Sequence, residues 1–536
     1  MSRFAHAQLG RRTVLGMGAG LSMVGLARAE PLASGMTSVV KTTNGPVVGL
    51  VRDGIPTFAG LRYGAPPTGA LRFTSPRKPT PWTTPAAALR FGPACIQMIG
   101  GGGAAKYPGT IGPALDQLMT AQEDVIRQSE DCLFLNVWTP ALDNKARPVM
   151  VWFHGGGYSY GSGAWPVYDG HNLAKRHDVV VVTVNHRLNV FGFLNTASIG
   201  GDPASGNAGM SDLVLVLEWV RDNIAGFGGD PGRVTTFGQS GGGAKSALAM
   251  TMPGAKGLVH RAIVQSGPAL RVGEQEAGAS LTRSIMAKLG VTDLKGLQAV
   301  PVPVLLSVAG NTWGPMIDGV SVTQHPFDPV NPQIADIPVM VGCTSDEQTL
   351  YNVGFDWWGK LTEAELATKL RPQYKDKTEA LIAAAKRQRP KDSPSYLYTD
   401  IMSKTVFIPS ATLAERKATQ RAPVYMYVWE WGAPADDGIM KAPHTMELPF
   451  IFDNVEKGPM FLGKDPSIFT LGKAASSAWT AFARTGDPNA PGGGLPKWPR
   501  FDAKTRATMM FNTRSRIEND PYAEFRALTP NASMFG

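Results

Sequence analysis

A serine enclosed by glycines is the first feature of the sequence that could do chemistry. Residues 238–242 read Gly-Gln-Ser-Gly-Gly, between an apolar run at 234–237 and a helix-forming stretch at 244–252. A serine at a sharp strand-to-helix turn is typical of a nucleophile elbow, which exposes its hydroxyl for attack on a carbonyl carbon. An ordinary turn is the alternative. The role of Ser240 therefore depends on an oxyanion hole, a general base and an acid that orients the base.

Three consecutive glycines could supply the oxyanion hole. His154-Gly155-Gly156-Gly157 follows the apolar run 149–153. Backbone N–H groups in such a loop can point at the negative charge that develops on a substrate oxygen. We expect Gly156, Gly157 and Gly241 to donate these N–H groups; a flexible glycine turn is the alternative.

The general base must be a histidine, and the chain order narrows the choice. In folds that use this elbow the nucleophile precedes the acid, and the acid precedes the histidine. The histidines after Ser240 are His260, His325 and His444. His260 follows the elbow too closely, and His325 stands in a turn before a proline. His444 lies on a loop that could reach Ser240, and a solvated loop histidine is the alternative.

The acid should follow a strand that lies between Ser240 and His444. The run 338–343 is followed by Thr-Ser-Asp346-Glu347, which places two adjacent carboxylates directly after a predicted strand. One would face the histidine and the other would act as a local cap. The residues alone leave the choice between Asp346 and Glu347 open.

The runs before these residues look like buried strands with helical segments between them, such as 212–224. They are 149–153, 179–184, 234–237, 262–264, 338–341 and 424–428. This pattern predicts an α/β fold with a mostly parallel sheet covered on both faces. Residues 47–51 predict short antiparallel strands, and 363–386 predict an exposed helix. We expect one large domain, residues 30–536, with helical insertions.

The first 29 residues predict an export signal. Arg11-Arg12 precede an apolar, glycine-rich stretch, and Ala27-Arg28-Ala29 offers a cleavage site. This pattern is typical of a twin-arginine signal peptide, which would make the protein periplasmic or secreted. An N-terminal anchor is the alternative, but the stretch is shorter than the ~20 residues that a membrane span needs.

Composition and charge exclude several classes of protein. The 536 residues are 43% hydrophobic and 18% charged, as in globular proteins. The net charge is +9, and removal of residues 1–29, which carry four arginines and no acid, leaves +5. Since no dense Lys/Arg run occurs, we expect no nucleic-acid binding. The sequence shows no clustered ligands at metal spacing, so we expect no metal or organic cofactor.

Three cysteines allow one disulfide in an oxidising compartment. Cys95 and Cys132 are the natural pair, and closing their loop would contribute roughly 4 kcal/mol. Cys343 ends an apolar run and is expected to be a buried small hydrophobe.

From about Val39 to Pro521 the chain resembles the type-B carboxylesterases, which include the cholinesterases and bacterial para-nitrobenzyl esterases. The matching segments are 58–67, 71–73, 129–138, 185–188, 192–194, 223–231, 265–267, 318–319 and 482–489. The resemblance implies an α/β-hydrolase fold with a small N-terminal antiparallel sheet, and hydrolysis of small-molecule esters.

The resemblance also assigns roles that the residues alone leave open. It makes Ser240 the nucleophile, His444 the base and Glu347, rather than Asp346, the acid. It places Ser266 close to this triad. The family's cysteine loop falls on Cys95 and Cys132, and it contains a single aromatic residue, Tyr107.

The chain departs from the family beside the nucleophile. Gln239 replaces the usual glutamate, Gly241 replaces alanine, and Gln348 replaces the glycine after the acid. A carboxylate close to the site would cost an anionic substrate on the order of 1–4 kcal/mol, and Gln239 removes that cost. The cysteine loop, with Tyr107 and no tryptophan, argues against a choline ester. We expect room for bulky or anionic esters, such as the tricarballylate esters of fumonisin-type toxins, beside simple aliphatic and aryl esters.

Two other functions are compatible with parts of this pattern. An amidase or lactonase could use the same elbow, and some cholinesterase-like proteins are binding modules that have lost the serine. The presence of Ser240, Glu347 and His444 favours ester hydrolysis through an acyl-enzyme. The sequence leaves the natural substrate open, as well as whether the protein is a monomer or a dimer.

Overall fold

The computed structural model describes residues 35–98, 107–119 and 127–530. The predicted signal peptide lies outside these residues, as does part of the loop between Cys95 and Cys132. Within the described ranges, no helix is both long and apolar enough to cross a membrane.

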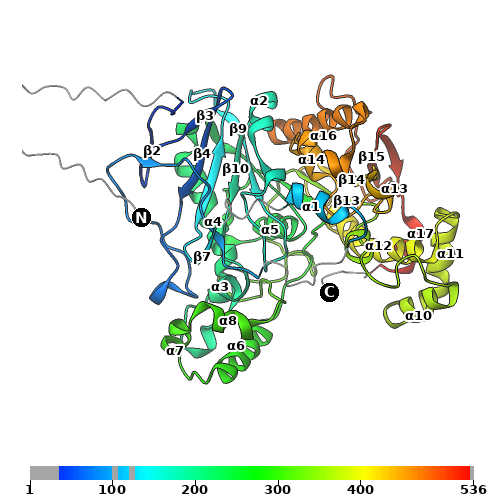
Figure 1. Ribbon diagram of the computed structural model, residues 1–536, viewed down its shortest axis with the longest axis horizontal. Helices are drawn as coiled ribbons and strands as arrows, with labels where there is room; N and C mark the ends of the chain where they lie inside the picture. The colour runs from blue at the N-terminus through cyan, green and yellow to red at the C-terminus, as the bar shows by residue number, and fades with distance from the viewer. Residues whose placement is uncertain (1–34, 99–106, 120–126, 531–536) are drawn as a thin grey trace, which may run out of the picture. The chain divides into compact units, whose positions relative to one another are not determined.

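A mixed sheet of eleven strands forms the centre of the described chain (Figure 1). Its middle strands are parallel and lie in the order β10 (Val180–Val184), β9 (Arg147–Phe153), β11 (Gly229–Gln239), β12 (Arg261–Gln265), β13 (Val339–Thr344), β14 (Val424–Trp429) and β15 (Ala507–Phe511). Antiparallel strands complete the edges: β8 (Phe134–Trp138), β4 (Ile55–Arg62) and β3 (Leu50–Arg52) beside β10, and β16 (Arg516–Asn519) beside β15.

Both faces of the parallel strands are buried. Along β9, Met150 and Trp152 pack into one hydrophobic cluster, and Val149, Val151 and Phe153 pack into another. The first cluster includes side chains of α2 (His171–His177), α14 (Leu448–Ile451) and α16 (Pro466–Thr485). The opposite face is covered by α4 (Ala208–Asn223), α5 (Gly241–Ala249) and α12 (Pro394–Lys417). This arrangement explains why the strands read as continuous apolar runs.

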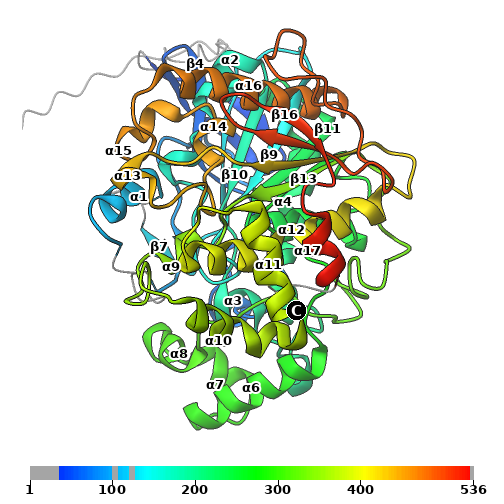
Figure 2. The same ribbon diagram turned by 90° about the vertical axis from the view of Figure 1, so that its right-hand side faces the viewer.

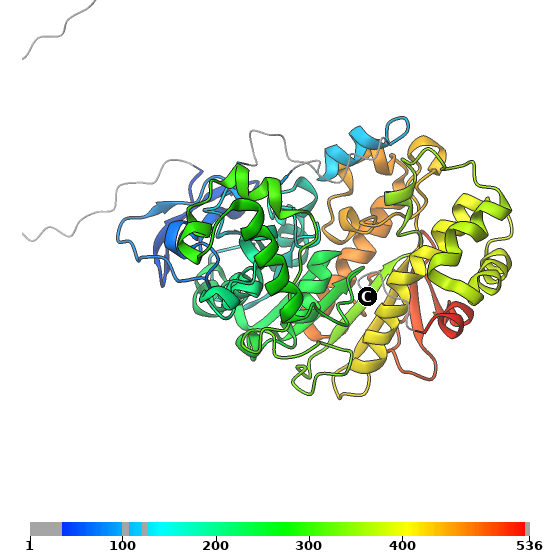
Figure 3. The same ribbon diagram turned by 90° about the horizontal axis from the view of Figure 1, so that it is seen from below.

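Two groups of helices extend from this core. The first is α6 (Gln275–Leu289), α7 (Leu294–Ala299) and α8 (Val302–Ala309), at the bottom of Figure 1, where α8 contacts α3 (Asn189–Phe193). The second is α10 (Glu363–Tyr374), α11 (Thr378–Gln388) and α17 (Ala523–Leu528), close to α12 in Figure 2. The view from below separates the green helices of the first group from the yellow-green helices of the second (Figure 3). The helices α6–α8 lie between β12 and β13, and α10 and α11 lie between β13 and β14, as helical insertions of the kind that the sequence predicts.

The predicted strands are confirmed, and most are longer than their apolar runs. The small sheet consists of β1 (Val40–Thr42), β2 (Gly45–Val48) and β5 (Ala86–Ala87), and β2 pairs with β5 in parallel, so this sheet is not wholly antiparallel. The prediction of one exposed helix over 363–386 is wrong. Lys375, at φ +49°, separates α10 from α11, and both helices bury leucines against α12.

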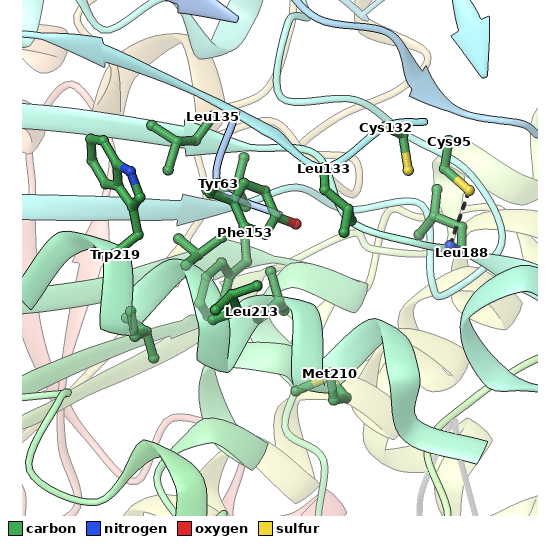
Figure 4. Close-up of a cluster of buried hydrophobic side chains, with 14 of the residues drawn as sticks. Tyr63, Cys95, Cys132, Leu133, Leu135, Phe153, Leu188, Met210, Leu213 and Trp219 are labelled. Atoms are coloured by element: carbon green, nitrogen blue, oxygen red, sulfur yellow. Dashed lines mark hydrogen bonds between the residues drawn. The ribbon is translucent and has the colours of Figure 1, made fainter. Parts of the chain in front are cut away.

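The predicted disulfide is not formed in the structure. Cys95, in β6 (Ala94–Cys95), and Cys132 are free, buried thiols that lie side by side (Figure 4). The Cys95 sulfur accepts a hydrogen bond of 3.3 Å from the Leu188 N–H. Burial and the neighbouring Cys95 raise the pKa of the Cys132 thiol, which favours its protonated form. Cys343 is a buried residue of β13, as predicted.

Candidate active site

The predicted site residues meet at one edge of the sheet because each follows the carboxyl end of a parallel strand. The loop 154–157 follows β9, Ser240 follows β11, Ser266 follows β12, and Glu347 follows β13. The loop after β14 brings in His444. In sheets of this kind, ligands bind outside the carboxyl ends of the strands.

Ser240 stands at a strained turn between β11 and α5. Its backbone has φ +59° and ψ −127°, a conformation that costs a non-glycine residue of order 1–3 kcal/mol. Two hydrogen bonds hold it: its N–H donates to the Gln265 carbonyl at 2.7 Å, and its carbonyl accepts from the Ala244 N–H at 3.0 Å. Gly242 must be glycine, since a Cβ there would lie 1.9 Å from the Phe153 carbonyl oxygen. The predicted elbow is therefore present.

Glu347 and His444 form a buried hydrogen-bonded pair. The His444 Nδ1 bonds to Glu347 Oε2, and the other carboxylate oxygen accepts from Ser266 Oγ at 2.6 Å and from the Thr344 N–H at 2.8 Å. The Glu347 side chain is fully buried. A carboxylate held in this way fixes the orientation of the imidazole and directs Nε2 away from Glu347.

The neighbouring carboxylate takes a different role. Asp346 forms an ion pair with Arg389, which also bonds to Asp400. Burial opposes its ionisation, but Arg389 and Ser345 keep the pKa of Asp346 below its usual value. Asp346 is thus part of an ion-pair network rather than the local cap that the sequence predicts.

The other two histidines lie elsewhere. His260 Nδ1 accepts from the Val234 N–H at 3.3 Å, and His325 Nε2 lies 3.2 Å from Glu274. Of the three histidines after the elbow, His444 alone faces Glu347, as predicted.

The side chain of Gln239 contacts the histidine directly. Its Nε2 lies 3.1 Å from His444 Nε2 and 3.3 Å from Nδ1. Because Nδ1 bonds to Glu347, the amide of Gln239 donates to Nε2. In the described residues the Ser240 hydroxyl has no hydrogen-bond partner; catalytic hydrogen bonds often form only when substrate binds.

The glycine loop lies against the elbow. A Cβ on Gly155 would be 3.5 Å from Ser240 Cβ, and one on Gly241 would be 2.2 Å from the Gly157 carbonyl oxygen. Gly156 and Gly157 have φ of +85° and +60°. Neither of these two N–H groups donates to an acceptor among the described residues. The structure thus brings Gly156, Gly157 and Gly241, the predicted donors, together beside Ser240.

The departure at Gln348 does not disturb the acid. Its backbone has φ −82°, which any residue adopts, so no glycine is required. Its N–H donates to Ser403 Oγ at 3.1 Å.

Sequence reasoning missed a second buried glutamate beside the pair. Glu447 Oε1 accepts from Gln265 Nε2 at 3.1 Å, and its Oε2 has no partner among the described residues. Burial, and to a smaller degree the charge of Glu347, raise the pKa of Glu447 to about 7. In the sequence, the one feature that points to Glu447 is its position three residues after His444. Among the described residues, no group of three or more His, Cys, Asp or Glu side chains could hold a metal ion.

Comparison with known proteins agrees with this geometry. The model of the carboxylesterase family matches residues 36–528, so the chain belongs to this family. The fold is that of the α/β-hydrolases, and the protein is a carboxylic ester hydrolase. A crystal structure of a Geobacillus stearothermophilus carboxylesterase is 34% identical, with a TM-score of 0.79 over 92% of this chain and 100% of that one.

Individual relatives differ in the substrates that their names state. The para-nitrobenzyl esterase of Bacillus subtilis is 34% identical over 91% of this chain and 97% of its own length. The phenmedipham hydrolase of Pseudarthrobacter oxydans is 33% identical over 88% and 94%.

Proposed function

We propose that the protein cleaves carboxylic esters through an acyl-enzyme on Ser240. Two observations carry this proposal: the strained Ser240 turn lies against the glycine loop, and Gln239, the residue before Ser240, contacts His444 of the buried Glu347–His444 pair. Nucleophile, oriented base and oxyanion donors are the three parts that this chemistry requires.

Each part has a defined step. Ser240 Oγ attacks the ester carbonyl while His444 Nε2 takes its proton, and Glu347 stabilises the resulting imidazolium. The N–H groups of Gly156, Gly157 and Gly241 bind the oxyanion of the tetrahedral intermediate. The alcohol leaves with the proton from His444. Water, deprotonated by the same histidine, then releases the acid and restores Ser240.

For His444 to accept this proton, the amide of Gln239 must release Nε2. Substrate binding would therefore exchange one hydrogen bond, from Gln239 to His444, for another, from Ser240 to His444. This exchange would give the Ser240 hydroxyl the hydrogen bond that it lacks among the described residues.

Covalent labelling tests the proposal. A fluorophosphonate should attach to Ser240, and Ser240→Ala should lose labelling and nearly all turnover of an aryl acetate. A protein that folds but neither labels nor turns over esters would be a binding module. Matched aryl amides and lactones, assayed beside the ester, would identify an amidase or lactonase by a higher kcat/KM than the ester gives.

We further propose that the site accepts esters of anionic or bulky acids, polycarboxylates of the fumonisin type included. The support is the contact of Gln239 with His444, which places a neutral amide where the family has a carboxylate. Paired neutral and anionic esters should be compared in Gln239→Glu and the wild type, over a range of salt. We expect the variant to lose about tenfold more in kcat/KM for the anionic ester than for the neutral ester, and this difference to shrink at high salt. Equal losses for both esters would contradict this preference.

The twin-arginine pattern leads us to propose export to the periplasm or the medium. Cell fractionation and the N-terminal sequence of the mature protein test this, with cleavage expected after Ala29. In that compartment the adjacent thiols of Cys95 and Cys132 could pair. Thiol counts with and without reductant, on protein isolated from the exported fraction, decide between the pair and the free thiols.

A further inference from the structure

Lys245 is a buried cation that the reaction described above does not use. It lies on α5, the helix that begins directly after Ser240, and is fully shielded from solvent. In the described part of the chain no aspartate or glutamate forms an ion pair with it. Lys404, which is buried in α12, is by contrast paired with Asp400 at 2.7 Å. A buried ammonium without a counter-ion is costly, so its presence beside the nucleophile points to a role in the reaction.

The side chain of Lys245 contacts the residues at both ends of the glycine loop 155–157. Its Nζ donates to the His154 carbonyl oxygen at 3.1 Å, where the loop begins. The same atom lies 5.3 Å from the centre of the Tyr158 ring, where the loop ends. Between these two contacts stand Gly155, Gly156 and Gly157, which have no side chains of their own to hold them.

The position of His154 determines the position of the donors. Gly155 lies against the Gln239 backbone: a Cβ on Gly155 would be 3.0 Å from the Gln239 carbonyl oxygen. At the far end, the Tyr158 carbonyl accepts from the Asn189 N–H at 2.7 Å. Lys245 supplies the corresponding anchor at the near end, on the His154 carbonyl.

The groups that face Lys245 carry no negative charge at neutral pH. The rings of His154 and His186 lie 4.7 Å apart. Burial first, and then the charge of Lys245, lower the pKa of both, that of His154 to about 3. Burial raises the pKa of Tyr158. Burial also lowers the pKa of Lys245 to about 7, so its charge is fully present only below that pH.

We propose that Lys245 is a positioning residue of the oxyanion hole: it fixes the His154 carbonyl, and through it the N–H groups of Gly156 and Gly157, and its unpaired charge favours the oxyanion. The inference rests on the acyl-enzyme reaction proposed for Ser240. Charges and dipoles that are in place before the reaction stabilise charge that develops in the transition state. Lys245 should therefore affect kcat far more than KM.

Two variants separate the hydrogen bond from the charge. Lys245→Met removes both at similar side-chain length, whereas Lys245→Gln keeps a donor without the charge. The matched control is Lys417→Met. Lys417 is also buried, donates to the Ala335 carbonyl at 2.6 Å, and has its pKa lowered to about 8 by burial, but it lies at the end of α12. Turnover of a neutral aryl acetate is measured from pH 6 to 9, per active site titrated with fluorophosphonate.

We expect Lys245→Met to lower kcat by about 10–100-fold with KM changed less than about threefold. Lys245→Gln should recover part of the loss. The ratio of wild-type to Lys245→Gln kcat should fall as pH rises through about 7, because the lysine loses its charge whereas glutamine is neutral at every pH. Lys417→Met should lower the melting temperature and leave kcat unchanged.

A kcat within about twofold of wild type in both Lys245 variants would overturn the inference, as would a loss equal to that in Lys417→Met. If Lys245→Met fails to fold, the ratio of wild-type to Lys245→Gln kcat tests whether the charge of Lys245 matters. A ratio that stays close to one at every pH would overturn the proposal. A wild-type protein that neither labels nor turns over esters would instead overturn the function proposed for Ser240.

Discussion

The two sides of Ser240 are held in place in different ways. On the base side, Glu347 and His444 are fixed by side-chain hydrogen bonds in a buried cluster. On the oxyanion side, backbone lies directly against backbone, with the Cα of Gly241 packed against Gly157.

This difference predicts how each side fails. On the base side, a substitution removes a hydrogen bond, and the strands still hold the backbone where it was. On the oxyanion side, one added methyl group has no space and must move the backbone. The base side is therefore sensitive to lost atoms and the oxyanion side to added ones, and the following experiments compare the two.

The largest effect is expected from Glu347→Gln. An amide can neither hold His444 in the required tautomer nor stabilise its cation, so kcat should fall by about 10³–10⁴-fold. Steady-state turnover of an aryl acetate measures this, and circular dichroism checks the fold.

The adjacent carboxylate is the matched control. Asp346→Asn breaks the ion pair with Arg389, so stability should fall by about 1–3 kcal/mol while kcat stays within about threefold. Equal catalytic losses in the two variants would show that the charge of the loop matters, and not the contact of Glu347 with His444.

Gly241→Ala breaks the oxyanion side. The added Cβ would lie 2.2 Å from the Gly157 carbonyl oxygen, so the loop must shift and kcat should fall by about 10–100-fold. Gly112→Ala is the control. Gly112 lies on the helix α1 (Ile111–Met119), and a Cβ there would meet only Tyr107, at 3.9 Å. Full activity in Gly241→Ala would contradict the inference that the packing of Gly241 against Gly157 leaves no space for a methyl group.

The sequence predicts the two sides of the site to different extents, because backbone packing holds one side and side-chain hydrogen bonds hold the other. The oxyanion side could be found from the sequence because close approach of backbones requires glycine, and Gly155–Gly157 and Gly241 are visible as such. The base side could be found only in part. Asp346 and Glu347 follow the same strand, and Arg389, which pairs with Asp346, lies at the end of α11. Only the resemblance to a family distinguished between them, and in the structure Glu347 is the one that bonds to His444.

Two buried charges were missed for a related reason. A lysine in a helix usually faces solvent, and nothing near Lys245 in the sequence shows that its neighbours in space are His154 and His186. Glu447 accepts a hydrogen bond from Gln265, which in turn accepts one from Trp479 of the helix α16, and both partners are distant from Glu447 in the chain. Burial of this kind arises from tertiary packing, which local pattern does not contain.

Glu447→Gln tests the base side through stability. The folded state raises the pKa of this carboxyl from 4.5 to about 7, so it binds the proton more tightly than the unfolded state does. The resulting stabilisation is complete below pH 4.5 and is lost as pH rises through 7, by about 3 kcal/mol. The amide imitates the protonated acid and avoids that loss. The melting temperature of the variant should therefore rise relative to wild type between pH 5 and 8, and a constant difference would contradict the assignment.

The smallest effect is expected at Ser266, where activity and stability separate. Its hydroxyl donates to Glu347 at 2.6 Å, and its backbone has φ +50°, a conformation that favours glycine. Ser266→Ala and Ser266→Gly both remove the hydrogen bond, so each should lower kcat by about tenfold with KM unchanged. Glycine relieves the backbone strain that alanine retains, so the glycine variant should be more stable than the alanine variant by about 1 kcal/mol. If kcat instead followed stability across the two, the serine would serve the backbone turn and not the carboxylate of the base side.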